Sequence, residues 1–249
     1  MSGHSHYATI KRQKESKDSA KGKTFSKLSR AIVIAIKSGG NTDPSANYKL
    51  RMAIDTAKAA NMPKANIERI LAKADAEIVL EQITYEGIGP SGISIIVEAV
   101  TDNRNRTGQE IKGMFDRGGG RLTGPGSVSY NFETKGMILI KQSEKKEEAM
   151  LKLIDKGVEE LEDTEDGIEV YIEVGNLKKV KEELEKEGFN LANVEIIQKA
   201  KTFKDITDAK LAEKALSFCE NLENHDDVQK VYTNLNIPVE ILNQIPTSQ

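Results

Sequence analysis

The chain has 249 residues, of which 38% are hydrophobic and 30% are charged, with a formal net charge of -3. This composition is too apolar for a disordered chain and too charged for a membrane protein, and the length allows one to three domains. The longest apolar runs, residues 31–36 and 93–97, are far shorter than the roughly 20 residues that cross a bilayer. We therefore expect a soluble protein with no membrane partner.

The cellular compartment is predicted from the N-terminal residues and the cysteine content. The opening sequence MSGHSHYATIKRQK lacks the apolar core of a secretory signal. A single cysteine, Cys219, allows neither a disulfide within the chain nor a cysteine-based zinc site. These features predict a cytoplasmic protein.

Charge is distributed unevenly along the chain. Residues 1–75 contain 15 lysines and arginines against 6 aspartates and glutamates, a net of +9, whereas residues 76–249 contain 21 against 33, a net of -12. This asymmetry is typical of a protein whose first part binds a polyanion and whose remainder repels it. The alternative is a chance fluctuation of surface charge.

Three helices are predicted within the first 75 residues from apolar residues at helical spacing. The first ends at Gly39-Gly40, Asp43-Pro44 is expected to open the second as N-cap and first helical residue, and Pro63 opens the third. The positions predicted to be buried in this bundle are Phe25, Leu28, Ile32, Ala35, Ile36, Leu50, Ala53, Ile54, Ala57, Ile67, Ile70, Leu71 and Ala74. The preceding residues, 7–22, have little to bury, and they form either a solvated terminus or a basic arm ordered by phosphates.

From about residue 77 the spacing of apolar residues changes, and strands are predicted. Strands at 82–88 and 93–100, a helix at 103–116, a glycine-rich loop at 118–126 and a strand at 127–132 come first. A strand at 136–142, a helix at 145–156, strands at 158–162 and 168–174, a helix at 176–187 and a strand at 191–199 follow in the order of a ferredoxin-like unit. A helix at 207–222 and a strand at 228–234 end the pattern.

The last helix and strand have no complete sheet of their own, so we expect them to complete the sheet that begins at residue 82. The predicted fold class is therefore α+β. An N-terminal helical bundle (1–76) is followed by an α/β domain (77–135 with 203–249), into which a second, ferredoxin-like domain (136–202) is inserted.

Several long motifs occur in a fixed order along the chain. GHSHYATIKRQK occupies residues 3–14, TDNRNRT residues 101–107, GGG at 118–120 leads to GSVSYNF at 126–132, and HDDVQKVY occupies 225–232. In these motifs the chain resembles the YebC/PmpR family of bacterial proteins, whose mitochondrial relatives are translational activators. The resemblance implies three domains, with the third inserted into the second, and a role as a probable DNA-binding transcriptional regulator or at the ribosome. Tyr7 stands where the family usually has tryptophan, and a tyrosine can still stack on a base.

The TDNRNRT motif is the stretch most like an active site. Asp102 beside Arg104 and Arg106 could hold a phosphate or position a substrate. Alternatively, Asp102 or Asn103 caps the following helix, and the arginines pair with carboxylates such as Glu98 or Glu110. A third hypothesis, a phosphate-ester enzyme built around Asp102, lacks a recognisable cluster of metal ligands in the sequence.

The remaining candidate sites favour structural interpretations. The loop at 118–126 follows a helix and precedes a strand, the wrong order for a nucleotide loop, so it is either a helix stop or a nucleic-acid contact built on Arg117 and Arg121. His4 and His6 cannot supply a full metal shell, and Cys219 is in register with buried positions.

We therefore predict a non-enzymatic regulator that binds nucleic acid, as a DNA-binding transcriptional regulator or, alternatively, as a ribosome-associated translation factor. No catalytic residue, metal, cofactor or small-molecule substrate is predicted. The partner is DNA or ribosomal RNA, and the ribosome in the second case. The residues predicted to bind nucleic acid are Lys11, Arg12, Lys14, Lys17, Lys21, Lys23, Lys27, Arg30, Arg104 and Arg106.

Overall fold

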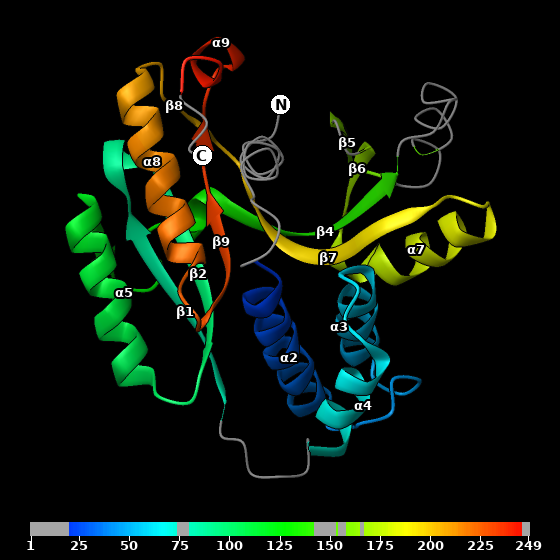
Figure 1. The fold of residues 1–249 in the computed structure, drawn as a ribbon. Helices are drawn as coiled ribbons and strands as arrows, with labels where there is room; N and C mark the ends of the chain where they lie inside the picture. The colour runs from blue at the N-terminus through cyan, green and yellow to red at the C-terminus, as the bar shows by residue number, and fades with distance from the viewer. Residues whose placement is uncertain (1–19, 74–79, 142–152, 154–157, 165–166, 246–249) are drawn as a thin grey trace.

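A computed structural model describes residues 20–73, 80–141, 153, 158–164 and 167–245, with side chains in the first helix from residue 24 onward. The fold is α+β, as predicted: an N-terminal helical bundle precedes two α/β domains, the third domain being inserted into the second (Figure 1). The basic arm before residue 20 and all of the helix predicted at 145–156 except the buried, helical Leu153 lie outside the described residues. Within the described residues, none of the helices combines the length and apolarity needed to cross a membrane.

The bundle consists of α2 (Ala20–Gly39), α3 (Tyr48–Ala59) and α4 (Lys64–Lys73). Their predicted apolar stripes meet in one core, because residues three and four apart share a helix face. The buried members of this core are Ile32, Ala35, Ile36, Leu50, Ile54, Ala57, Met62 and Ile67, with Phe25, Leu28, Ala53, Ile70 and Leu71 packed partly against them.

The predicted start of the second helix is wrong. Asn47, rather than Asp43, caps α3, and its side chain accepts a hydrogen bond from the Leu50 N–H at 3.1 Å. Asp43 instead accepts from the Ser45 N–H at 2.8 Å in the turn before the helix. Both residue types cap helices well, but the amide of Asn47 also donates to the Ala35 carbonyl at 2.9 Å, which ties α3 to α2.

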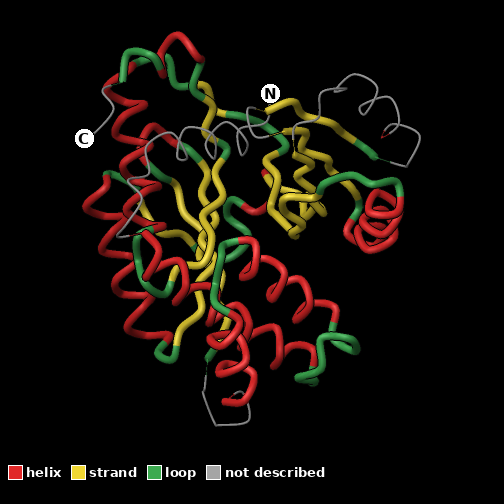
Figure 2. Tube along the Cα trace, turned by 45° about the vertical axis from the view of Figure 1, so that its right-hand side comes forward, coloured by secondary structure: helices red, strands yellow, loops and turns green. Residues whose placement is uncertain are grey.

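The second domain is built on sheet A, in which the strand order is β3-β1-β2-β9. Its strands are β1 (Glu81–Ile88), β2 (Ser94–Thr101), β3 (Arg121–Thr123) and β9 (Val228–Thr233), and all neighbours are antiparallel. Helices α5 (Arg104–Gly118) and α8 (Ala209–Glu223) cover one face of the sheet (Figure 1, Figure 2). The C-terminal strand β9 thus completes the sheet begun by β1, as the sequence predicted.

The C-terminal segment adds short elements beyond this sheet. Strands β8 (Lys204–Asp205) and β10 (Leu235–Asn236) pair in parallel, and the chain continues into α9 (Val239–Leu242). None of these three was predicted from the sequence. They are too short for a repeating apolar pattern to be visible.

The third domain is built on sheet B, in which the strand order is β5-β6-β4-β7. The strands are β4 (Phe132–Lys141), β5 (Glu160–Thr164), β6 (Gly167–Ile172) and β7 (Leu191–Ala200), and α7 (Leu177–Lys186) packs on one face. This antiparallel arrangement agrees with the predicted ferredoxin-like order. Because β4 begins at Phe132, a boundary at residue 136 would divide a strand, and we propose that the inserted domain spans residues 132–200.

Most of the strand predicted at 127–132 is a loop that contains the short helical turn η2 (Ser129–Asn131), and only Phe132, the first residue of β4, is in a strand. Here the carboxylate of Glu86 accepts backbone hydrogen bonds from Gly126, Val128 and Ser129, at 2.8, 2.8 and 3.0 Å. Because these N–H groups bind a side chain, they are not available for a strand ladder. The local apolar pattern therefore indicated the wrong structure.

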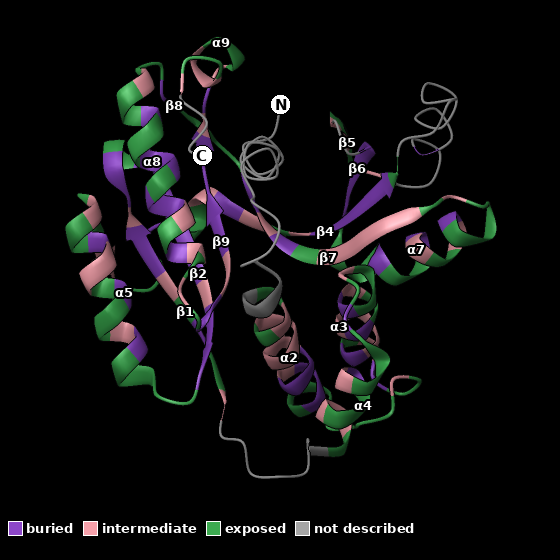
Figure 3. Ribbon diagram, viewed as in Figure 1, coloured by how far each residue is buried: buried purple, intermediate pink, exposed green. Residues whose placement is uncertain are grey.

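Sheets A and B share a second apolar core on the faces that the helices leave free. Side chains alternate along a strand, so Ile95 and Val97 of β2 face α5 and α8 while Ile96 points to the opposite side. There Ile96 and Tyr232 pack with residues of sheet B that include Met137 and Leu139. Figure 3 shows the buried positions along both sheets.

The bundle core is separate from the cores of the sheets, and a cavity of about 800 Å³ lies between them. Its apolar lining comes largely from α2 and α3, and its charged lining includes Glu98, Glu195 and Lys230. Lys230 pairs with Glu195 and lies opposite Glu98 in the register of β2 and β9. Burial raises the pKa of Glu98. Charged side chains therefore line part of the space between the bundle and the sheets, while Met52 of α3 packs against the core of sheet B.

Candidate nucleic-acid interface

The structure describes the side chains of four of the predicted nucleic-acid contacts: Lys27, Arg30, Arg104 and Arg106. The other six lie in the first 23 residues. Lys11, Arg12, Lys14 and Lys17 fall outside the described residues, and Lys21 and Lys23 belong to α2 but their side chains are not described. The geometry of the interface is therefore built from the four described cations.

Lys27 and Arg30 of α2 contact the end of α8. The Lys27 ammonium donates to the carbonyl oxygen of Glu223, the last residue of α8, and the Arg30 guanidinium donates to the carbonyl oxygen of Asp226 in the turn that follows this helix. The C-terminal carbonyl groups of a helix carry partial negative charge, which favours cations at this place. These two contacts attach the N-terminal bundle to the second domain.

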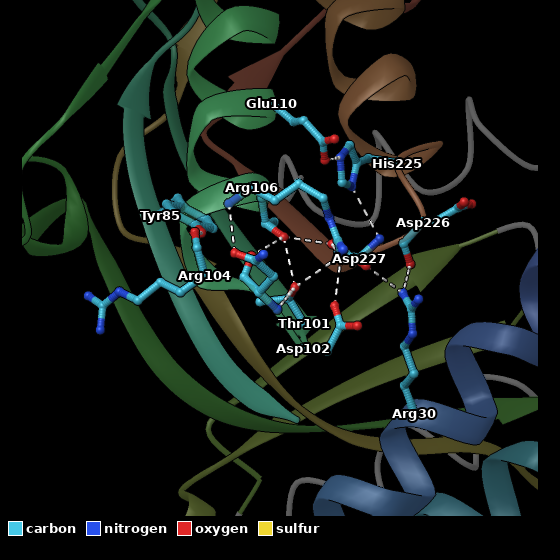
Figure 4. A network of polar contacts seen from close by, with 12 residues as sticks. Arg30, Tyr85, Thr101, Asp102, Arg104, Arg106, Glu110, His225, Asp226 and Asp227 are labelled. Carbon is cyan, nitrogen blue, oxygen red and sulfur yellow. Dashed lines mark hydrogen bonds and ion pairs between the residues drawn. The ribbon is translucent and has the colours of Figure 1, made fainter. Parts of the chain in front are cut away.

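The carboxylate of Asp227 forms ion pairs with two arginines (Figure 4). Its Oδ1 lies 3.0 Å from Arg30 Nη1, and its Oδ2 accepts from Arg106 Nη2 at 3.0 Å and from Thr107 Oγ1 at 2.6 Å. Burial alone would raise the pKa of the Asp227 carboxyl, but hydrogen bonds from Thr107 and Arg106 and the charge of Arg30 hold this pKa below its ordinary value. Asp227 is only 3% exposed and its pKa is lowered, so it is a buried, ionised group at the junction of two domains.

The TDNRNRT segment forms the turn between β2 and α5. Asn103 is the N-cap of α5, because its side chain accepts from the Arg106 N–H at 3.1 Å. Arg106 pairs with Asp102 at 2.8 Å as well as with Asp227, rather than with Glu98 or Glu110 as the sequence suggested. Helix capping accounts for Asn103, and ion pairing within the chain accounts for Arg106, in agreement with the structural alternative for this motif.

Arg104 differs from Arg106. Its side chain is exposed and points away from the Asp227 cluster (Figure 4). Its backbone carbonyl accepts from the Tyr85 hydroxyl at 3.5 Å. Among the four described cations, Arg104 is the one oriented toward solvent for an external anion.

His225 lies beside this cluster. Its Nδ1 accepts from the Asp227 N–H at 3.1 Å, so its Nε2 carries the proton of the neutral ring and donates to Glu110 at 2.9 Å. Glu110, His225 and Asp227 are close enough together to hold a metal ion. However, the oxygens of Asp227 already bind two guanidinium groups, which would repel a metal cation at the same place.

The glycine-rich loop contains the predicted helix stop. Gly119 is the C-cap of α5 in the left-handed conformation, with φ 80°. A Cβ atom added at Gly118 would lie 2.1 Å from the nearest ring carbon of Phe218. That ring packs edge-on against Phe115, with 5.1 Å between the ring centroids.

Cys219 is fully buried in the same core, as predicted, and burial raises the pKa of its thiol.

Fold and site together define a three-domain α+β protein in which an arginine-rich strand-to-helix turn is joined to a basic helical bundle through one aspartate. The model of the TACO1/YebC protein N-terminal domain matches residues 5–77, and that of the TACO1/YebC second and third domain matches residues 80–235. The chain belongs to the TACO1/YebC family, as its resemblance to YebC/PmpR proteins indicated.

Relatives and one solved structure match nearly the whole chain. A protein of Syntrophomonas wolfei is 42% identical over 97% of this chain and 99% of its own length, and one of Chloroflexus aurantiacus is 44% identical over 97% and 98%. Both are named probable transcriptional regulatory proteins. The crystal structure of a conserved hypothetical protein from Aquifex aeolicus is similar with a TM-score of 0.84, at 41% identity over 90% of this chain and 94% of that one.

Proposed function

We propose that this chain is a non-enzymatic, cytoplasmic regulator of transcription that binds DNA through its N-terminal region. The observation that carries the proposal is the net charge of +9 in residues 1–75 against -12 in the remainder. Such segregation directs a polyanion to one part of the molecule. The names of the relatives, probable transcriptional regulatory proteins, support regulation of transcription as its purpose.

We assign the phosphate contacts first to the cations before residue 24 and to Arg104. The former are Lys11, Arg12, Lys14, Lys17, Lys21 and Lys23. Lys27, Arg30 and Arg106 were predicted to make such contacts too, but they already bind groups within the chain. A phosphate would have to compete with Asp227 or with the carbonyl groups at the end of α8 to reach them. Their part in DNA binding is therefore expected to be smaller.

Contacts to phosphate position a protein on DNA without reading its sequence. The sequence contains no helix-turn-helix or zinc-finger signature that would place side chains on base edges. We therefore propose that discrimination between DNA sites depends on the shape and deformability of the duplex. A narrow minor groove, where the negative potential is strongest, would suit the row of lysines in the arm.

The proposal is tested by selecting duplexes from a random pool with the full chain at physiological salt and comparing the affinities of selected and unselected DNA. A regulator of transcription requires a ratio on the order of 10³ or more. In parallel, a cell lysate is fractionated on a sucrose gradient. A ratio near one, together with sedimentation of the protein with ribosomes, would contradict regulation of transcription and favour a translation factor.

A further inference from the structure

Tyr130 is the most exposed large apolar residue among the described side chains, at 68%. It lies in the loop between β3 and β4, within the GSVSYNF motif. A ring that is so exposed adds little to the apolar core, since stabilisation follows the area removed from water. Its exposure leaves the ring accessible to a ligand.

The backbone on both sides of Tyr130 is firmly held. Before it, the buried carboxylate of Glu86 accepts from the N–H groups of Gly126, Val128 and Ser129. After it, the side-chain amide of Asn131 donates to Ser94 Oγ of sheet A at 2.9 Å. The ring is thus presented to solvent by a loop with a defined conformation, which reduces the entropy lost when a ligand binds.

A cation lies next to this tyrosine. The ammonium of Lys201 donates to the carbonyl oxygen of Tyr130 at 3.0 Å, and the backbone N–H of Lys201 donates to the Asn131 carbonyl at 2.7 Å. Lys201 is exposed, and so are Phe203 and Lys204, which follow it. An exposed aromatic ring and an ammonium group therefore share one small surface.

We propose that Tyr130 and Lys201 form a contact for an unpaired nucleotide, with the base stacked on the ring and its phosphate beside the ammonium. Proteins that bind single strands without sequence preference combine stacking rings with cations in this way. The adjacent ammonium of Lys201 favours a ligand that carries negative charge, as the phosphate of a nucleotide does. This contact rests on the proposed function, which is the binding of nucleic acid. It adds the recognition of unpaired strands to that function.

The test uses the full chain and a labelled single-stranded oligonucleotide, as DNA and as RNA, beside the duplex of the same sequence. Tyr130→Ala should weaken binding of one or both single strands about tenfold, because stacking on an aromatic ring is lost. Binding of the duplex should stay within about twofold. Tyr130→Phe, which keeps the ring, should bind like the wild type, and so should Leu211→Ala, which removes another exposed apolar side chain from α8.

A second variant tests the phosphate part of the contact. Lys201→Ala should lower the slope of log affinity against log salt for the single strand by about 0.7, the value for one phosphate. If Tyr130→Ala binds both single strands as tightly as the wild type, the nucleotide contact is refuted while duplex binding through the basic region still stands. A wild-type chain that binds neither strands nor duplex would refute both proposals. A change in molecular mass in solution caused by Tyr130→Ala, with unchanged affinity for single strands, would make Tyr130 a protein contact instead.

Discussion

The guanidinium group of Arg30 lies 3.0 Å from the carboxylate of Asp227, and this ion pair joins the helical bundle to the second domain. The same carboxylate binds Arg106, so one buried anion pairs with two cations from different parts of the chain. Positive charge at this junction is therefore used to hold the domains together. Of the residues predicted to bind nucleic acid, those that we assign to an external polyanion lie nearer the N-terminus and at Arg104.

Asp227→Asn should destabilise the folded chain by about 2 kcal/mol, because both guanidinium groups lose their ionised partner. The cost stays below that of a fully buried pair, since the side chains of Arg30 and Arg106 are 30% and 45% exposed. The measurement is the free energy of unfolding in urea. Asp116→Asn, an exposed carboxylate of α5, serves as the matched control and should change stability by less than about 0.5 kcal/mol. Equal effects of the two variants would show that the junction does not depend on Asp227.

The stability of the junction should also depend on pH in the acid range. The pKa of Asp227 is lower in the folded chain than its ordinary value of 3.8, so its contribution is complete above that value and is lost as the pH falls through the folded pKa. Between about pH 5 and about pH 2.5 the wild type should therefore lose more free energy of unfolding than Asp227→Asn. Parallel curves for the two proteins would mean that Asp227 titrates alike in the folded and unfolded chains.

Gly118→Ala should destabilise the second domain by about 1 to 3 kcal/mol through overpacking. The added methyl group would meet the ring of Phe218 at 2.1 Å, and that ring cannot move away from its contact with Phe115 without loss. Gly124→Ala is the matched control in the same glycine-rich segment, because nothing lies within 4 Å of its new atom. Thermal unfolding of both variants checks this prediction, and equal melting temperatures would contradict it.

Glu86→Gln should loosen the loop that carries Tyr130. Glutamine keeps one acceptor oxygen and places an N–H₂ group against at least one of the N–H donors of Gly126, Val128 and Ser129, so at least one hydrogen bond to a charged group is lost. Hydrogen exchange of these amides should accelerate about tenfold, while exchange in α3 of the bundle stays unchanged. Unchanged protection of all three amides, those of Gly126, Val128 and Ser129, would show that Glu86 does not hold the loop.

Much of the fold could be predicted from the sequence because its signals are local and repeated. The stripe from Phe25 to Ile36 and the change to alternating residues after residue 77 identified the bundle and the strands. The return of the last strand to sheet A followed from counting elements, since β9 had no other sheet to join. Each of these inferences needed only the spacing of apolar residues and the turn residues between them.

The contacts between distant residues could not be predicted in this way. Arg30 and Asp227 lie 197 positions apart, and the Glu86 carboxylate binds N–H groups about 40 positions away. Nothing in the local sequence distinguishes Asp227 from Asp226, or shows that Asn47 rather than Asp43 caps α3. In each case the burial of the side chain determines which residue makes the contact, and this burial depends on the completed fold.

Binding of DNA by the basic N-terminal region is tested most directly by the salt dependence of the full chain. Replacing Lys14, Lys17 and Lys21 together with alanine should reduce the slope of log affinity against log salt on duplex DNA by about 2 to 3, because each phosphate contributes about 0.9. Replacing Lys178, Lys179 and Lys186, three exposed lysines of α7, removes the same charge from the anionic part and should leave the slope unchanged. A wild-type slope and affinity in the first variant would contradict DNA binding by the N-terminal region. An equal reduction of the slope in both variants would contradict it as well.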